Sequence, residues 1–359
     1  MTDLLYSEAE DDLRAAVRSL LADRGDTASV LVRAEAGAPY DAELWKALAG
    51  DIGAAGLLVP EKLGGQGASH REAAVVLEEL GRSVAPAPYL TSSVIATETL
   101  LALDVQAPEV GGLIEELATG RKSAVLAVPL SASPHGPLPV DAPRITGVAD
   151  AAVADVLLVL KSDGLYAVDK ASVTVEAQTP LDLTRPLAAV TVGDTAQATR
   201  LADAATAEQA VRRGLLAGAG LLASEQLGLA EWCLEETVRH TRERHQFNRP
   251  IGSFQALKHR MAQMWLEVVS ARAAARNAAD ALATGSPEAP LAVAVAQAYS
   301  SRVSVHAAEE CVQLHAGIGM TWEHPAHLYL KRAKADEIAL GTPGRHKEAL
   351  AELIDLQAP

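Results

Sequence analysis

The first third of the chain carries hydrophobic residues at helical spacing, separated by short breaks that contain Gly or Pro. Residues 7–24 predict an amphipathic helix, with Ser7 as its N-cap and Glu8 and Glu10 in its first turn. The same periodicity predicts further helices over residues 41–48, 69–80, 91–103 and 112–118. We therefore expect an α-helical domain over residues 1–120.

The pattern changes near Lys122 to short runs of apolar or β-branched residues. Pro, Gly and Asp punctuate these runs at a spacing that is typical of strands. The runs cover residues 123–128, 153–160, 164–168, 173–177 and 188–192. They predict a small β domain over residues 121–205.

The remainder of the chain is rich in Ala and Leu, a composition that favours helix. Helices are expected over residues 206–243, 254–284 and 291–316, and a last one ends near Asp355. They predict a helical domain over residues 206–359.

A turn marked by Pro250 and Gly252 separates the first two of these long helices. A guanidinium, an amide and an aromatic ring beside a turn suit a planar ligand that bears phosphate. The alternative is a solvated loop between two core helices. The polar and aromatic side chains at its tip are Arg242, Arg244, His245, Gln246 and Phe247.

Composition excludes several classes of partner. The chain is 49% hydrophobic but only 3% aromatic, so its cores are built from Ala, Leu and Val. The net charge of −15 argues against nucleic acid and against anionic membrane surfaces as partners. Cys233 and Cys311 have no metal-ligand spacing, which fits a reducing compartment. No apolar run approaches 18 residues and the start lacks a signal pattern, so we expect a cytoplasmic protein without a membrane span.

Three blocks of sequence, in order, carry a family resemblance. Residues 244–259 read RHQFNRPIGSFQALKH, and residues 313–325 read QLHAGIGMTWEHP. A weaker block over residues 56–81 contains GLLVP, GGQG and LEELG. Each block alone is a weak signal. Together they cover most of the chain, and it resembles the acyl-CoA dehydrogenase family.

This resemblance implies a mainly α fold with an N-terminal α domain, a middle β-barrel and a C-terminal four-helix bundle. It implies FAD as cofactor, an acyl-CoA thioester as substrate and an electron-accepting flavoprotein as redox partner. Thr342 is expected to touch a flavin phosphate. In the family, the residues at five further positions reach the flavin of a neighbouring subunit: Arg244, Gln246, Phe247, Gln313 and Gly317.

The β domain departs from the family pattern. Where the family carries a T-E-P-x-x-G-S-D-like segment that binds the flavin ring, residues 128–136 read VPLSASPHG. That run has hydroxyl groups and a turn but no recognisable motif. We therefore expect Ser131, Ser133 and His135 to belong to a plain loop.

The residues at the expected positions of the catalytic base also differ from the family pattern. The family reaction needs a carboxylate in an apolar slot that raises its pKa. Leu340 stands where the family often has Glu, and Gly218 stands at the alternative position used by some relatives. Glu225 lies two helical turns further on and is our candidate for the base. Two alternatives remain open: Glu225 is a buried, hydrogen-bonded structural residue, or the base comes from a partner chain.

Other polar residues carry weaker signals. His324 and His327 share a turn with Glu323, but no third ligand follows by spacing, so we expect no metal site. Arg332 and Lys334 are expected on a solvated face.

Taken together, the sequence resembles small actinobacterial-type acyl-CoA dehydrogenases that form heterotetramers on steroid side-chain CoA esters. The chain keeps the contacts given to a neighbour's flavin and lacks a recognisable set for its own, so we expect an unlike partner subunit. Two alternatives stay open: a self-sufficient homotetramer that uses Glu225, and a non-catalytic assembly subunit.

Overall fold

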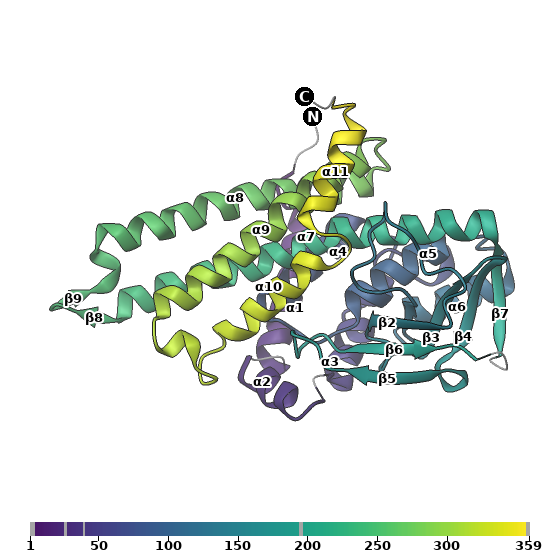
Figure 1. Cartoon of the computed structure of the whole chain (residues 1–359), viewed down its shortest axis with the longest axis horizontal. Helices are drawn as coiled ribbons and strands as arrows, with labels where there is room; N and C mark the ends of the chain where they lie inside the picture. Colours follow the sequence, from purple (N-terminus) through teal and green to yellow (C-terminus); the bar gives the residue numbers. More distant parts are fainter. Residues whose placement is uncertain (1–3, 25–26, 39, 194–196, 357–359) are drawn as a thin grey trace.

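The structure is a computed structural model that describes residues 4–24, 27–38, 40–193 and 197–356. Figure 1 shows the long C-terminal helices side by side, with the strands gathered towards one end of the molecule. A small hairpin, β8–β9, projects at the opposite tip. The fold therefore places the middle domain and the hairpin far apart.

The N-terminal part is helical, as predicted. Ser7 Oγ accepts the N–H of Glu10 at 3.2 Å, and Glu10 Oε2 accepts the N–H of Ser7 at 2.7 Å. Ser69 and Glu72 form the same reciprocal cap at the start of α4. The helices are α1 (Glu8–Arg24), α2 (Thr27–Glu35), α3 (Ala42–Lys46), α4 (His70–Arg82), α5 (Thr97–Leu101) and α6 (Pro108–Ala118). Short 3-10 and π-helical turns join them at Ala47–Asp51, Ala54–Gly56, Glu61–Leu63 and Tyr89–Ala96.

The strands form two separate sheets, so the expected closed β-barrel is wrong. The strands are β1 (Ala124–Leu126), β2 (Arg144–Ala149), β3 (Val156–Lys161), β4 (Gly164–Asp169), β5 (Thr174–Gln178), β6 (Leu187–Thr191) and β7 (Ala198–Asp203). One sheet has the order β1-β3-β4-β7 and the other β2-β6-β5. Within the described residues no hydrogen-bonded strand pair joins the two sheets, so the ring does not close.

Two strands were not predicted, for different reasons. In β2, Gly147 has a φ of +70° and the register with β6 shifts between Ile145 and Val148, so the apolar alternation is broken. In β7 most side chains are exposed, so the strand lacks an apolar run.

The last part is the expected helical bundle. It consists of α7 (Ala204–Glu243), α8 (Gln255–Ala283), α9 (Ala289–His315), α10 (Ala326–Ile338) and α11 (Pro343–Leu353). The hairpin of β8 (His245–Gln246) and β9 (Arg249–Pro250) links α7 to α8. In the part of the chain that the structure describes, no helix has the length and apolarity needed to cross a membrane.

Two glycines let α4 and α7 approach closely. A β-carbon added to Gly228 would lie 1.8 Å from the carbonyl oxygen of Glu78, and one added to Gly81 would lie 2.0 Å from that of Glu225. Neither distance is sterically possible for a real side chain. The N-terminal domain and the bundle are therefore in backbone contact at the level of Glu225.

We predict that Gly228→Ala lowers the free energy of unfolding by about 1–3 kcal/mol, because the added methyl group overlaps backbone that cannot move aside. Gly112→Ala in α6 is the control, since no atom outside its own helix lies within 4 Å of that β-carbon. The control should raise stability by about 0.5–1 kcal/mol. Thermal unfolding of both variants measures this, and equal effects would contradict the close contact.

Candidate active site

The two positions that the sequence resemblance assigns to the family's base lie side by side. Gly218 is in α7, and Leu340 is in the turn between α10 and α11. A β-carbon on Gly218 would lie 3.2 Å from Leu340 Cδ1 and 2.6 Å from Ile95 Cγ1. Both positions therefore face one point in space, and the residues that meet there are apolar.

The space at this point is small. A cavity of about 20 Å³ lies there, lined by Ile95, Leu126, Leu215 and Leu340 among others. That volume holds about one water molecule. In this conformation it cannot hold an acyl chain.

An acid bonded to the wall of this cavity is one that the sequence did not single out. Thr91 lines the cavity, and its hydroxyl donates to Asp150 Oδ2 at 2.7 Å. Burial raises the pKa of Asp150 to about 6. Asp150 follows β2 in a turn, so its sequence context is that of an ordinary loop acid.

Hydrogen bonds to backbone atoms hold the boundary between the β domain and the α10–α11 turn. We call this boundary the seam. The N–H of Leu340 donates to the carbonyl of Leu130 at 2.7 Å, and the His346 ring lies 3.1 Å from the carbonyl of Leu340. Leu340 has a φ of +54°, a strained conformation for a leucine that these contacts hold in place. A β-carbon on Gly341 would lie 3.2 Å from the Ser133 side chain. The segment after β1, which the sequence marks as lacking the flavin motif, is thus joined to the turn that lacks the base.

Two larger cavities lie along the same seam. One of about 280 Å³ is lined by Leu130, Arg185 and Ile338, and one of about 660 Å³ by Ser133 and Thr342 among others. Thr342 is exposed, and its hydroxyl accepts the N–H of Arg345 at 3.3 Å, which caps α11.

Glu225 is held in a buried cluster of charges, which we call the Glu225 ion network; it consists of Asp182, Arg185, Glu225, Arg332 and Asp336. Glu225 Oε1 accepts from Arg185 Nη2 and from Arg332 Nη1, both at 2.5 Å. Arg185 also donates to Asp336 at 2.9 Å, and Arg332 to Asp182. This geometry matches the structural interpretation of Glu225, because one oxygen already binds two guanidinium groups.

The network corrects one expectation. Arg332 is 2% exposed, so its placement on a solvated face is wrong. Its position in α10 directs it toward the acids of α7 and of the segment before β6, which compensate its charge. Lys334 is partly exposed and pairs with Glu309 at 2.9 Å.

The Glu225 ion network is short of one positive charge, since it contains three carboxyl and two guanidinium groups. Burial raises the pKa of Asp336 to about 8, although Arg185 opposes the shift. Burial also acts to raise the pKa of Asp182, but Arg332 and Arg185 outweigh it and the pKa is lowered. A proton on Asp336 therefore balances the charges at neutral pH.

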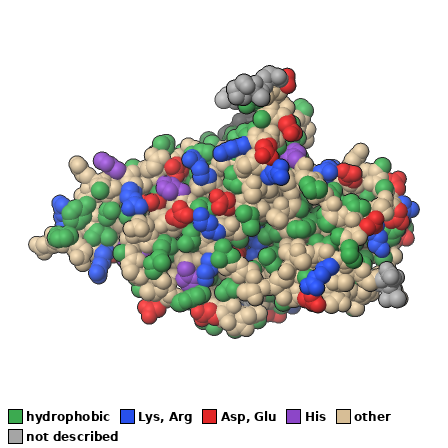
Figure 2. Space-filling model, viewed as in Figure 1, with side chains coloured by type: hydrophobic (Ala, Val, Ile, Leu, Met, Phe, Trp, Pro, Cys, Tyr) green, Lys and Arg blue, Asp and Glu red, His purple; other side chains and the backbone are tan. Residues whose placement is uncertain are grey.

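The β8–β9 hairpin presents its side chains to the outside. Phe247 and Asn248 have φ values of +52° and +60°, as in a two-residue type I′ turn. Phe247 is 86% exposed, and Arg244 and Gln246 are exposed beside it. Figure 2 shows basic and hydrophobic side chains together at this tip. A phenylalanine that is both strained and exposed indicates a contact with another molecule.

The remaining expected flavin contacts lie elsewhere. Gln313 and Gly317 are exposed at the end of α9, where Ala316 has a φ of +53°. Within the described residues, no hydrogen bond or ion pair joins them to the hairpin. Thr342 lies at the start of α11, on the seam described above.

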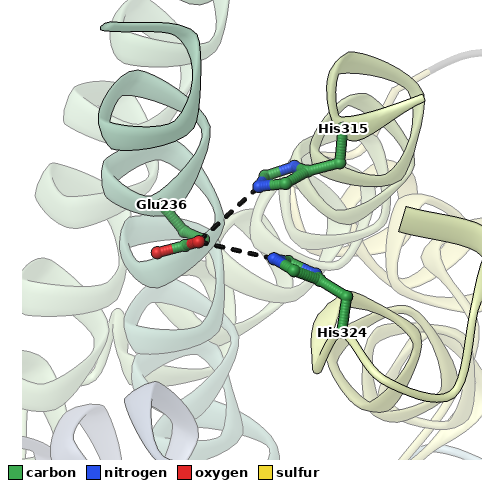
Figure 3. Close-up of side chains that lie close together, drawn as sticks. All are labelled: Glu236, His315 and His324. Atoms are coloured by element: carbon green, nitrogen blue, oxygen red, sulfur yellow. Dashed lines mark hydrogen bonds and ion pairs between the residues drawn. The ribbon is translucent and has the colours of Figure 1, made fainter. Parts of the chain in front are cut away.

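The two histidines of the 322–327 turn have different surroundings. His327 packs against Trp322, with ring centroids 4.6 Å apart. His324 instead faces Glu236 of α7 and His315 of α9, two elements that are distant in sequence (Figure 3).

Comparisons with known proteins decide the family. Residues 7–103 match the acyl-CoA dehydrogenase N-terminal domain and residues 192–354 match the C-terminal domain. The chain is 37% identical to acyl-CoA dehydrogenase IpdE2 of Mycolicibacterium smegmatis, over 94% of this chain and 96% of that protein. It belongs to the acyl-CoA dehydrogenase family. IpdE2 of Mycobacterium tuberculosis is 36% identical, with 94% of each chain covered.

Solved structures agree with this assignment. The ChsE4-ChsE5 complex from Mycobacterium tuberculosis superposes with a TM-score of 0.87 at 26% identity, over 100% of both chains. The Tcur3481-Tcur3483 steroid ACAD superposes with a TM-score of 0.83 at 25% identity, over 97% of this chain and 98% of that one. The family acts on CH–CH bonds of acyl-CoA substrates with FAD. The exposed donors and aromatic ring of the hairpin fit such a group, while the cavity beside Leu340 is too small for an acyl chain.

We predict that the stability of the chain falls as pH rises from 7 to 8.5. Asp336 has a pKa of about 8 when folded against an ordinary 3.8, so unfolding in this range releases a proton and is favoured by higher pH. Asp336→Asn stays neutral and should flatten the dependence of Tm on pH. Glu208→Gln, an exposed change in α7, should keep the wild-type slope. An unchanged slope in Asp336→Asn would contradict a protonated Asp336.

Proposed function

We propose that this chain is a subunit of an FAD-dependent acyl-CoA dehydrogenase that works with an unlike partner chain. The partner supplies the catalytic base and the main flavin site, and this chain supplies the hairpin that touches the partner's flavin. The observation that carries the proposal is the meeting of Gly218 and Leu340 at a cavity for one water molecule. At the point where the reaction would remove a proton, no acid lines the cavity and there is no room for substrate.

The hairpin suits contact with a dinucleotide. When bound, FAD accepts the hydride that leaves the β carbon of the acyl thioester. Arg244 provides paired donors for a phosphate, Gln246 an amide, and Phe247 a flat apolar face. Because the chain has a net charge of −15, an anionic ligand needs local basic groups, and Arg242 and Arg249 add to Arg244 here.

The relatives support an unlike partner and a steroid-derived substrate. Two similar structures are named as pairs of different proteins, ChsE4-ChsE5 and Tcur3481-Tcur3483, and the second is named a steroid ACAD. We therefore propose a CoA ester of a steroid side chain as substrate. An electron-accepting flavoprotein reoxidises the reduced enzyme.

The rival homotetramer would need Glu225 as base. Glu225 is seven residues from Gly218, which is about 10 Å along the axis of α7. Its Oε1 atom binds Arg185 and Arg332. Both facts favour a structural Glu225. The non-catalytic assembly subunit is disfavoured because it gives no role to the exposed, strained Phe247.

Turnover of acyl-CoA tests the proposal. The chain alone should be inactive on straight-chain and steroid side-chain CoA esters, and co-expression with an unlike acyl-CoA dehydrogenase chain should give activity. Glu225→Gln in that assembly should lower thermal stability, because two buried guanidinium groups lose their shared charge, while turnover per folded site stays near normal. Activity of the isolated chain that Glu225→Gln lowers by 10²- to 10⁴-fold would establish the rival.

Flavin affinity tests the hairpin. Arg244→Ala in the assembly should weaken FAD binding by about 10- to 150-fold, the usual effect of losing one charged hydrogen bond. Arg144→Ala removes an equally exposed arginine that pairs with Glu176 in the β domain, and it should leave affinity unchanged. Equal FAD affinity in wild type and Arg244→Ala would remove Arg244 from the site.

A further inference from the structure

Three side chains from three elements converge near the end of α9. Glu236 lies in α7, His315 ends α9, and His324 lies in the turn before α10 (Figure 3). His315 Nε2 is 3.6 Å from Glu236 Oε1, and His324 Nε2 is 3.4 Å from the same oxygen. One ligand atom from each of the three residues lies within 4.8 Å of the other two.

His315 has a buried nitrogen without a hydrogen-bond partner. The residue is 2% exposed, and its Nδ1 lies 2.6 Å from the carbonyl of Cys311, which fixes the ring with its proton on that side. Nε2 is then directed at the Glu236 carboxylate and makes no hydrogen bond. A nitrogen lone pair that faces a carboxylate is repelled unless a cation lies between them. Such orphaned groups point to an ion or water that completes the site.

The distances favour a metal ion over a proton as this cation. A charge-assisted N–H···O bond measures about 2.7–2.9 Å, shorter than either contact to Glu236. Donor atoms that surround a tetrahedral Zn²⁺, each about 2.0–2.2 Å from it, are separated by about 3.3–3.6 Å. The observed 3.4 and 3.6 Å match that edge. The ring centroids of His315 and His324 are 4.3 Å apart, so both nitrogens approach Glu236 from one side.

We propose that Glu236, His315 and His324 bind a divalent first-row transition metal ion, with Zn²⁺ the expected occupant. Two imidazole nitrogens and one carboxylate are a donor set that such ions prefer, and the fourth position is left to water. His315 precedes the 316–323 loop and His324 follows it. The ion therefore links both ends of that loop to α7 and has a structural role.

The contacts around these three side chains resemble those of a metal-binding site. Two of the contacts compete with a metal ion for its ligands. The Nδ1–H of His315 on a backbone carbonyl is the usual outer-shell bond of a metal-binding histidine. Arg239 donates to both oxygens of Glu236, at 2.5 and 2.9 Å, and its charge lowers the affinity for a cation. His324 Nδ1 accepts the N–H of Ala326 at 3.2 Å. Ligation through Nε2 moves the proton of this ring to Nδ1, so the buried N–H of Ala326 loses this acceptor when the ion binds.

Titration with Co²⁺ tests the site on the full, untagged chain after chelation. We expect one Co²⁺ per chain with the visible absorption of nitrogen and oxygen coordination. His315→Gln and His324→Gln should each weaken binding by at least the 10- to 100-fold typical of losing an outer-shell partner. Arg239→Gln should strengthen it by removing the competing charge. His306→Gln, which removes a more exposed α9 histidine paired with Glu267 at 2.6 Å, should change nothing.

Three results would overturn the site: no saturable Co²⁺ binding, binding that survives in both His315→Gln and His324→Gln, or equal loss in His306→Gln. The cation would then be a proton on His315, whose pKa Cys311 and Glu236 raise to about 9 against the effect of burial. Circular dichroism checks folding; if His315→Gln unfolds, the less buried His324→Gln carries the test. None of these measurements uses turnover, so the site stands or falls separately from the proposed function.

Discussion

The Glu225 ion network is the interaction on which the rest of the arrangement depends. Asp182 and Arg185 come from the segment between β5 and β6, Glu225 from α7, and Arg332 and Asp336 from α10. A buried charge costs several kcal/mol unless an opposite charge meets it, so these three parts have few ways to fit together. Networks of this kind fix geometry more than they add stability. Here the fixed geometry brings the end of α10, and the turn with Leu340, against Gly218 of α7.

The network also explains why an acid lies in the apolar middle of α7. With Arg332 and Arg185 buried beside it, an apolar residue at position 225 would remove the carboxylate that both guanidinium groups share. The acids of the Glu225 ion network therefore hold the domains together. The residues that meet between Gly218 and Leu340, the proposed point of α-proton removal, are apolar. The side chains that we propose to contact another molecule lie on the surface, at the strained tip of the β8–β9 hairpin. An inward site without acid and an outward site with donors fit the proposal that this chain forms one half of a shared active site.

Sequence alone was sufficient where the signal is local. The long Ala- and Leu-rich helices and the cap at Ser7 follow from periodicity and side-chain chemistry. A closed barrel could not be judged from the sequence, because closure depends on pairing between strands that are distant in sequence. In addition, β2 and β7 lack an apolar alternation. At the site, the turn marked by Pro250 and Gly252 was predicted and is found as the β8–β9 hairpin, while the roles of the hairpin and of the base positions stay predictions.

Contacts between distant residues were not predictable. Nothing local indicates that Arg332 meets Glu225, 107 residues away, so a basic residue on a helix looked solvated. His324 likewise found its companions on α7 and α9, whereas a search by spacing examined only its own turn. Asp150 is unremarkable in sequence and becomes visible only through its bond to Thr91 at the cavity wall.

The central claim is that this chain contributes to a flavin site without holding one of its own. The most direct measurement is the ratio of FAD to polypeptide in the purified assembly, from flavin absorbance and the mass of the intact complex. The account predicts no FAD on the chain alone and one FAD for each pair of unlike chains. One FAD for every copy of this chain in a homo-oligomer would contradict it.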